Sequence, residues 1–236
     1  MKAFPNYKFN TVHIGNLYEF EKHIFGIRSG EALLTPNEFF SIHSNKFLDL
    51  LSGFFYLCWI PVPLLFAAYL FLKKKEQFFR FSLTFLLANF IGFIGYYLYP
   101  AAPPWYIHKF GTHFYPLTPG NAAGLERFDS ITGLHIFKGL YAKSSNVFAA
   151  VPSLHSAYPV LVLYYGLTNR LGWINIIFTI IMVGIWFSAV YNNHHYIVDV
   201  LLGIGCAIAA IISFNWFVKN TTWADYQLKK LVKAVE

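Results

Sequence analysis

The sequence predicts an all-α integral membrane protein, because its composition is too apolar for a soluble domain and its apolar residues occur in long runs. Of the 236 residues, 56% are hydrophobic and 20% aromatic, whereas only 12% are charged. A soluble domain carries about 25% charged residues, which cover its water-facing surface. We therefore expect a bundle of about five to six transmembrane helices with an interfacial N-terminal helix.

The first 46 residues mix charged, aromatic and apolar side chains. Phe20 and Ile24 lie close in sequence to Glu21 and Lys22. Such a mixture is typical of an amphipathic helix on a membrane surface. Residues 1–46 are therefore predicted to form an amphipathic interfacial segment, with a short soluble cap as the alternative.

Five apolar runs follow, each a candidate membrane span by its length and hydropathy. They cover residues 47–72, 81–99, 153–167, 173–191 and 195–218. Together they define a transmembrane catalytic domain over residues 47–218. Pro61 and Pro63 are expected to kink the first span, which membrane helices tolerate when neighbouring groups satisfy the freed carbonyls.

The longest segment between spans covers residues 100–150. It begins with three prolines in five residues, which cannot continue a helix. A loop of this length in a compact protein is usually functional, and we expect it to lie over the active site. After the last span, residues 219–236 are predicted to form a basic interfacial tail.

Two short motifs open apolar runs and carry the ionisable residues of interest. The first ends Pro152-Ser153-Leu154-His155, and the second runs from Ser188 through His195 to Asp199. On one helix, His195 and Asp199 would share a face. The aspartate would then orient one ring nitrogen and leave the other for chemistry. A structural capping pair is the alternative, but ionisable residues in membrane spans usually mark functional sites.

Alternating five spans places both motifs and the 100–150 loop on the same side of the membrane. Dense cations lie at the other side, around Lys73, Lys74 and Lys75 and in the tail. Cation clusters at span ends favour the cytoplasmic face. The active site is therefore predicted on the periplasmic, extracytoplasmic or luminal side, and the net charge of +7 is explained by topology rather than by nucleic acid.

The two motifs together resemble those of the type 2 phosphatidic acid phosphatase superfamily, which read Pro-Ser-Gly-His and Ser-Arg-x5-His-x3-Asp. The spacing from Ser188 to His195 to Asp199 is the same. Pro-Ser-Leu-His-Ser, the doubled histidine and the Tyr-Pro-Ala-Ala-Pro-Pro-Trp-Tyr segment more closely resemble the inositol phosphorylceramide synthase-like branch. This resemblance covers most of the chain.

The resemblance implies a phosphohistidine mechanism that needs no metal or other cofactor. His195 would attack phosphorus, Asp199 would orient it, and His155 would protonate the leaving oxygen. The implied activity is transfer of a phosphorylated headgroup to a lipid alcohol, with membrane lipids as donor and acceptor. The alternative within the same superfamily is a lipid phosphate phosphohydrolase of the phosphatidic acid, phosphatidylglycerophosphate or polyprenyl diphosphate type.

The sequence departs from the phosphatase pattern at its cations. Ala189 stands at the arginine position, and no Lys-x6-Arg-Pro motif precedes the loop. A phosphodiester carries less charge than a phosphomonoester and needs fewer cations, which favours the transferase. The residues expected to bind substrate are Ser153, Tyr191, Asn192, His194, Lys143, Arg127, Trp105 and Tyr106, of which Lys143 and Arg127 are the candidate replacement cations.

Two other classes remain open from the sequence alone. A metal enzyme would use His155, His194, His195 and Asp199 as ligands, although adjacent histidines on a helix rarely reach the same ion. A transporter would use the same intramembrane polar residues for binding without chemistry, but no inverted repeat is visible in the sequence. Oligomeric state is not indicated by the sequence.

Overall fold

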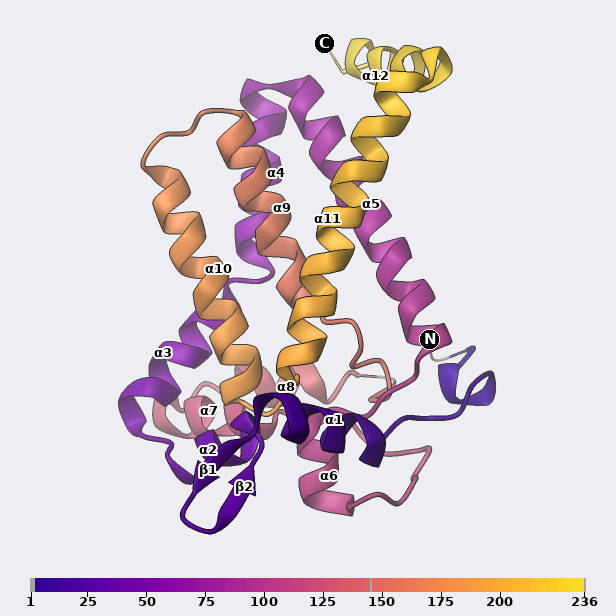
Figure 1. Cartoon of the computed structure of the whole chain (residues 1–236). Helices are drawn as coiled ribbons and strands as arrows, with labels where there is room; N and C mark the ends of the chain where they lie inside the picture. Colours follow the sequence, from indigo (N-terminus) through magenta and orange to yellow (C-terminus); the bar gives the residue numbers. More distant parts are fainter. Residues whose placement is uncertain (1–2, 145, 236) are drawn as a thin grey trace.

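The computed structural model describes residues 3–144 and 146–235, and most of them are helical. The long helices lie side by side, while the short elements gather mainly at one end of the bundle (Figure 1). Apolar side chains on these long helices remain exposed to the surroundings, for example Ile94, Leu72 and Ile212. This outward-facing apolar surface is that of an integral membrane protein.

Within the described residues, four helical stretches are long and apolar enough to cross a membrane. They are Lys46–Lys73, which comprises α3 (Lys46–Leu57) and α4 (Pro61–Lys73), then α5 (Lys75–Leu98), α10 (Ile174–Tyr191) and α11 (Ile197–Asn220). The first is interrupted just before Pro61, which cannot donate a backbone hydrogen bond. This interruption confirms the kink expected from the prolines.

The remaining predicted span, residues 153–167, forms α9 (Leu154–Thr168), which has 15 residues. At 1.5 Å per residue it is about 22 Å long, shorter than a typical membrane helix. It packs against α5, α10 and α11, and Leu161, Val162 and Tyr165 are buried in this contact. We expected five to six spans, whereas four helical stretches of the described residues are long enough to be candidates. The difference arises at α9, which is a short inner helix of the bundle.

The close approach of α9 and α11 depends on a glycine. A Cβ atom added to Gly203 would lie 2.0 Å from the carbonyl oxygen of Ser153. No side chain fits at that distance, so Gly203 lets α11 lie directly against the start of α9. This contact brings the two sequence motifs to the same end of the bundle.

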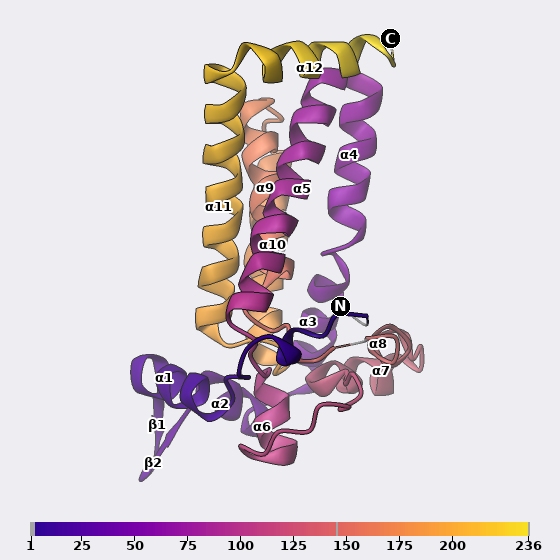
Figure 2. The ribbon, with the colours of Figure 1, turned by 90° about the vertical axis from the view of Figure 1, so that its right-hand side faces the viewer.

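The N-terminal segment contains more structure than one interfacial helix. It comprises η1 (Asn6–Lys8), α1 (Gly15–Phe25), a hairpin of β1 (Ile27–Ser29) and β2 (Ala32–Leu34), and α2 (Pro36–Ile42). The two short strands are an exception to the all-α expectation. Thr35 and Glu38 form a capping box that begins α2. Figure 2 shows α1 and α2 below the long helices, at the end where α9 and α11 begin.

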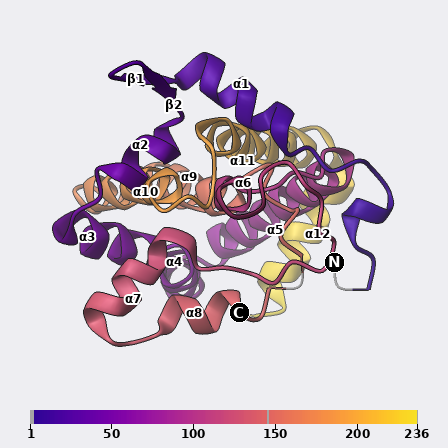
Figure 3. The same cartoon turned by 90° about the horizontal axis from the view of Figure 1, so that it is seen from below.

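The 100–150 segment folds over the same end. It contains α6 (Pro104–Phe110), η2 (Ala123–Leu125), α7 (Glu126–Thr132) and α8 (Ile136–Tyr141). Seen from below, α1 and α2 lie on one side of α6, and α7 and α8 lie on the other (Figure 3). The last helix, α12 (Thr222–Lys233), lies across the opposite end of the bundle (Figure 2).

Candidate active site

His155 lies in the first turn of α9, and aromatic side chains from another part of the chain fix its ring. The Tyr56 hydroxyl lies 2.9 Å from His155 Nδ1. The Trp59 ring packs on the imidazole with a centroid distance of 4.3 Å. Tyr56 lies near the end of α3 and Trp59 in the break that follows it, so the interruption before Pro61 supplies both contacts.

His195 lies in the turn between α10 and α11, two residues before the helix begins. The N–H groups of His194 and His195 both donate to the carbonyl of Ala189, at 3.1 and 3.0 Å. The prediction that His195 and Asp199 share one helix face was therefore wrong. Asp199 reaches the turn instead as the third residue of α11, where its Oδ2 accepts a hydrogen bond from Tyr196 N at 2.9 Å.

This geometry still brings His195 and Asp199 together. His195 Nδ1 lies 3.5 Å from Asp199 Oδ2. The separation exceeds that of an N–H···O hydrogen bond, and catalytic hydrogen bonds often shorten only when substrate is bound. Asp199 is completely buried, so its carboxylate has few competing partners. The arrangement orients Nδ1 toward the carboxylate and leaves Nε2 for a reacting group.

The two histidines face the same small cavity. Their ring centroids are 5.7 Å apart with an interplanar angle of 69°. The cavity has a volume of about 150 Å³, and both rings line it. Its other polar lining includes Trp105, Asn121, Tyr141, Ser144, Asn146 and His194. The sequence motifs thus converge on one polar site, as the span count predicted.

Burial keeps the turn histidines neutral. It lowers the pKa of His195 to about 4 and that of His194 to about 3, where the neighbouring His195 adds to the effect. A neutral imidazole has a lone pair on one ring nitrogen. His195 therefore offers an unprotonated ring nitrogen at neutral pH.

His194 lines the cavity but is held as part of its wall. Its Nε2 lies 2.9 Å from the carbonyl oxygen of Ala122, so Nε2 carries the proton and donates. Its ring stacks on Tyr141, with centroids 4.4 Å apart, and also on Tyr56. His194 therefore connects the motif to the 100–150 segment.

Trp105 is one of the predicted substrate-binding residues that the structure brings to the cavity. Tyr106 is buried elsewhere, and its hydroxyl donates to the carbonyl of His113. Ser153 is completely buried outside the cavity lining, and its N–H donates to the carbonyl of Asp199 at 2.9 Å. Ser153 thus connects the starts of α9 and α11.

Neither of the two candidate cations is among the residues that line the cavity. Arg127 Nε donates to Asp49 Oδ1 at 2.6 Å, and the Tyr191 hydroxyl donates to the same oxygen at 2.8 Å. Asn192 Nδ2 donates to the carbonyl of Ser188 within α10. Lys143 is exposed on the 100–150 segment. Among the lining residues that the structure describes, none is lysine or arginine.

Sequence reasoning missed several residues that build this site. Tyr56, Trp59 and Tyr141 lie in apolar or aromatic sequence where no motif distinguishes them from membrane anchors. Asn121 and Asn146 lie in the long loop, where polar residues are ordinary. Only the prediction that this loop is functional could have directed attention to them.

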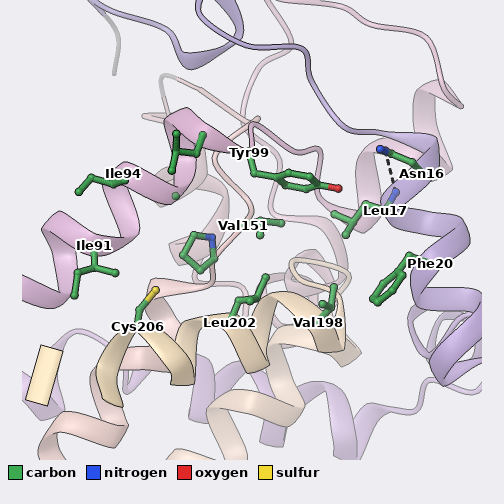
Figure 4. A pocket seen from close by; sticks show the side chains of 13 residues that line it. Asn16, Leu17, Phe20, Ile91, Ile94, Tyr99, Val151, Val198, Leu202 and Cys206 are labelled. Carbon is green, nitrogen blue, oxygen red and sulfur yellow. Dashed lines mark hydrogen bonds between the residues drawn. The ribbon is translucent and has the colours of Figure 1, made fainter. Parts of the chain in front are cut away.

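A separate apolar groove runs beside the site. It lies between α1, α5 and α11 and has a volume of about 630 Å³. Figure 4 shows Phe20 of α1, Ile94 of α5 and Leu202 of α11 facing it from three directions. Two of the long helices form its walls, so a hydrocarbon chain is the chemical group that this lining suits.

The groove is adjacent to the catalytic motifs along the chain. Val151 and Pro152 line it, and the preceding Ala150 lines the histidine cavity. Val198 lines it as well and immediately precedes Asp199.

The described residues contain no group of three or more histidine, cysteine, aspartate or glutamate side chains that is arranged to hold a metal ion. A metal enzyme built on His155, His194, His195 and Asp199 therefore has no ligand set in this part of the chain. No solved structure matches the protein.

Comparison with known proteins identifies several relatives of this chain. Phosphoinositol dihydroceramide synthase of Bacteroides thetaiotaomicron is 49% identical over 92% of this chain and 72% of its own length. Inositol phosphorylceramide synthases of Candida albicans and Saccharomyces cerevisiae are 28% and 29% identical over 74% and 68% of this chain, and each match covers 40% of the yeast protein. The PAP2 superfamily matches residues 33–213, and the chain belongs to this superfamily.

Proposed function

We propose that this protein is a membrane-embedded phosphotransferase that passes a phosphorylated headgroup from a lipid phosphoester to a lipid alcohol through a phosphohistidine on His195. The observation that carries the proposal is the convergence of His155 and His195 on one small cavity lined mostly by polar side chains, with Asp199 behind His195. The bacterial relative is named for joining phosphoinositol to dihydroceramide, which is a reaction of this class.

In the first half-reaction, His195 Nε2 attacks the phosphorus of the donor. A P–N bond forms, and the P–O bond to the diacylglycerol oxygen breaks. The proton on Nδ1 faces Asp199, whose carboxylate stabilises the positive charge that develops on the ring. His155 gives a proton to the leaving oxygen, so the first product departs as a neutral alcohol.

In the second half-reaction, His155 accepts the proton of the incoming lipid alcohol. The alcohol oxygen attacks phosphorus, the P–N bond breaks, and His195 returns to its neutral form. Tyr56 serves both steps, because its hydroxyl oxygen accepts from Nδ1–H of His155 in the charged and in the neutral form, which leaves Nε2 to release and take up the proton. His155 therefore exchanges protons with both alcohols, while His195 carries the phosphoryl group from one to the other.

The charge of the cavity favours a phosphodiester donor. The lining that the structure describes contains histidine, asparagine, serine, tyrosine and tryptophan side chains and no lysine or arginine. A phosphodiester carries one negative charge, which neutral hydrogen-bond donors and a histidine can accommodate. Lys143 and Arg127 remain the predicted cations that bind the phosphate of the donor. In this structure Arg127 donates a hydrogen bond to Asp49.

The dimensions of the two cavities favour a lipid as donor and as acceptor. The histidine cavity, at about 150 Å³, is smaller than the roughly 300–1,000 Å³ of ordinary ligand pockets. It suits the reacting phosphate group, and the adjacent apolar groove suits a hydrocarbon chain.

The proposed membrane arrangement has five membrane-associated helices, of which α9 is the fifth. In it, α1 and α12 lie at the two membrane surfaces, and the active site lies outside the cytoplasm.

The proposal is tested with the protein purified in detergent and a phosphoinositide whose headgroup is labelled. Products are identified by mass spectrometry with and without a ceramide acceptor, and His195→Ala is the blank. A headgroup-bearing sphingolipid that forms only with acceptor, and only with intact His195, is the expected result.

Two outcomes would contradict the proposal. Release of inositol phosphate at the same rate with or without acceptor would identify a hydrolase, the alternative of the same superfamily. Full transfer by His195→Ala would remove His195 from the mechanism altogether.

A further inference from the structure

A buried glutamate of the N-terminal segment caps the helix that follows the nucleophile. The side chain of Glu21 in α1 is completely buried. Its two oxygens accept hydrogen bonds from Ile197 N at 2.8 Å and Val198 N at 3.3 Å. These are the first two N–H groups of α11, which have no partner within the helix.

A second residue of this segment holds the other side of His195. The buried Asn37 of α2 donates through Nδ2 to the carbonyl of Val190 at 2.8 Å and to that of His195 at 3.0 Å. The backbone around His195 is thus hydrogen-bonded on one side to the amide of Asn37 and on the other to the carboxylate of Glu21. Both come from a region more than 150 residues earlier in the chain.

We propose that Glu21, in its ionised form, is a positioning residue for His195. By holding the first turn of α11, its carboxylate sets where Asp199 lies relative to His195 Nδ1. This inference rests on the proposed function of His195 as nucleophile. Glu21 precedes the region 33–213 that the PAP2 superfamily matches, so the superfamily match does not supply this role.

Burial of a carboxylate costs free energy because the charged group loses its hydration, so a buried glutamate indicates a specific role. In the part of the chain that the structure describes, Glu21 has no lysine or arginine within ion-pair distance. Its charge is stabilised by the two N–H groups and the positive end of the α11 dipole. Neutral residues could pack here, but none of them offers two acceptor oxygens with a negative charge.

Burial raises the pKa of Glu21 to about 7, and the nearby Asp199 carboxylate adds to this effect. The other titratable groups of this region are Tyr196, which precedes α11, Tyr18 on α1 and Glu38 on α2. Tyr18 donates to Glu38 and accepts from Lys22, so that lysine is engaged away from Glu21. A change in the charge of Glu21 near neutral pH is therefore expected to change its hydrogen bonds to the first turn of α11.

The test compares the isosteric variant Glu21→Gln with wild type, using Glu19→Gln as the matched control because Glu19 is exposed on the same helix. The glutamine offers one acceptor oxygen and turns an N–H group toward the second donor. We expect kcat to fall about tenfold to a hundredfold, since small displacements of reacting groups have effects of this size. KM for the donor should change less than threefold, because Glu21 lies outside the cavity lining.

The pH profile gives a second readout. In wild type, kcat should fall as the pH drops below about 7, where Glu21 takes up a proton and becomes a weaker acceptor. Burial lowers the pKa of His195 to about 4, so His195 loses its nucleophilic form only at lower pH. The limb near pH 7 should be absent in Glu21→Gln and retained in Glu19→Gln.

Hydrogen exchange followed by mass spectrometry reads the contact itself, independently of activity. The segment containing Ile197 and Val198 should exchange faster in Glu21→Gln than in wild type, with the rest of α11 unchanged. Equal exchange in the two proteins would overturn the inference even if no headgroup transfer were detected, in which case the proposed function would fail separately. A folded Glu21→Gln protein with wild-type kcat and pH profile would also overturn it.

Discussion

The two histidines of the cavity are held by different means. His155 lies within a regular helix, and side chains fix its ring: the Tyr56 hydroxyl at Nδ1 and the Trp59 ring against its face. His195 lies in an irregular turn, and contacts to the backbone fix its place, through Ala189, Asn37 and the capped start of α11. The proposed acid–base residue is thus oriented by contacts to its ring, and the proposed nucleophile by contacts to its backbone.

This difference matches the role proposed for each residue. In the proposed mechanism His155 exchanges protons with two different oxygens, and a hydroxyl partner accommodates both protonation states. His195 presents one nitrogen to phosphorus within a narrow range of positions. A backbone that is hydrogen-bonded on both sides restricts the position of His195 more strictly than a contact to its side chain would.

The largest expected effect separates the two histidines by leaving group. His155→Ala should lower lipid headgroup transfer by about 10²- to 10⁴-fold, which is the usual contribution of a general acid. With a phosphodiester that releases nitrophenol, which leaves without protonation, His155→Ala should recover most of its first half-reaction, followed as nitrophenol absorbance. His195→Ala should show no recovery, because the attacking atom is gone. Recovery in His195→Ala but not in His155→Ala would mean that the roles have been assigned to the wrong histidines.

A smaller effect is expected from the hydroxyl that orients His155. Tyr56→Phe keeps the packing and removes the hydrogen bond to Nδ1. A hydrogen bond to a charged group contributes about 1.5–3 kcal/mol, so kcat should fall about tenfold or more. The nitrophenol-releasing donor should suppress this loss, since protonation is no longer needed. Tyr69→Phe, a partly exposed tyrosine on α4, is the control and should be unchanged.

The smallest effect is expected at the amide that holds the turn. Asn37→Ala leaves the carbonyls of Val190 and His195 without their donor. A loss of about 1 kcal/mol in positioning corresponds to roughly a fivefold fall in kcat. This loss should be the same for lipid and nitrophenol donors, in contrast to Tyr56→Phe. A donor-dependent loss would show that Asn37 acts through His155 and would remove the distinction between the two histidines.

Much of the site was predictable because its chemistry is concentrated in short motifs. The pairing of His195 with Asp199 follows from their spacing, although the structure reaches it through a turn and a helix cap rather than one helix face. The placement of both motifs at one end followed from alternating the apolar runs. Trp105 was expected near the substrate and lines the cavity.

The differences between expectation and structure share a physical cause. Residues 153–167 were predicted as a span from hydropathy, which reports only that a segment is apolar, whereas the structure shows α9 as a 15-residue helix inside the bundle. Glu21 was read as the polar face of an interfacial helix, since a local pattern cannot distinguish a carboxylate facing water from one facing a distant helix terminus. Arg127 was predicted to bind phosphate, and its partner in the structure is Asp49, 78 residues away.

The sequence by itself therefore determined the membrane class, the candidate catalytic residues and their common end of the bundle, because these depend on composition and on spacing within single segments. Only the tertiary structure decided which tyrosine faces His155, which carboxylate caps α11 and which residues line the cavity. Those contacts join segments as far apart as Glu21 and Ile197, and their free energy arises from packing and burial that no local pattern encodes.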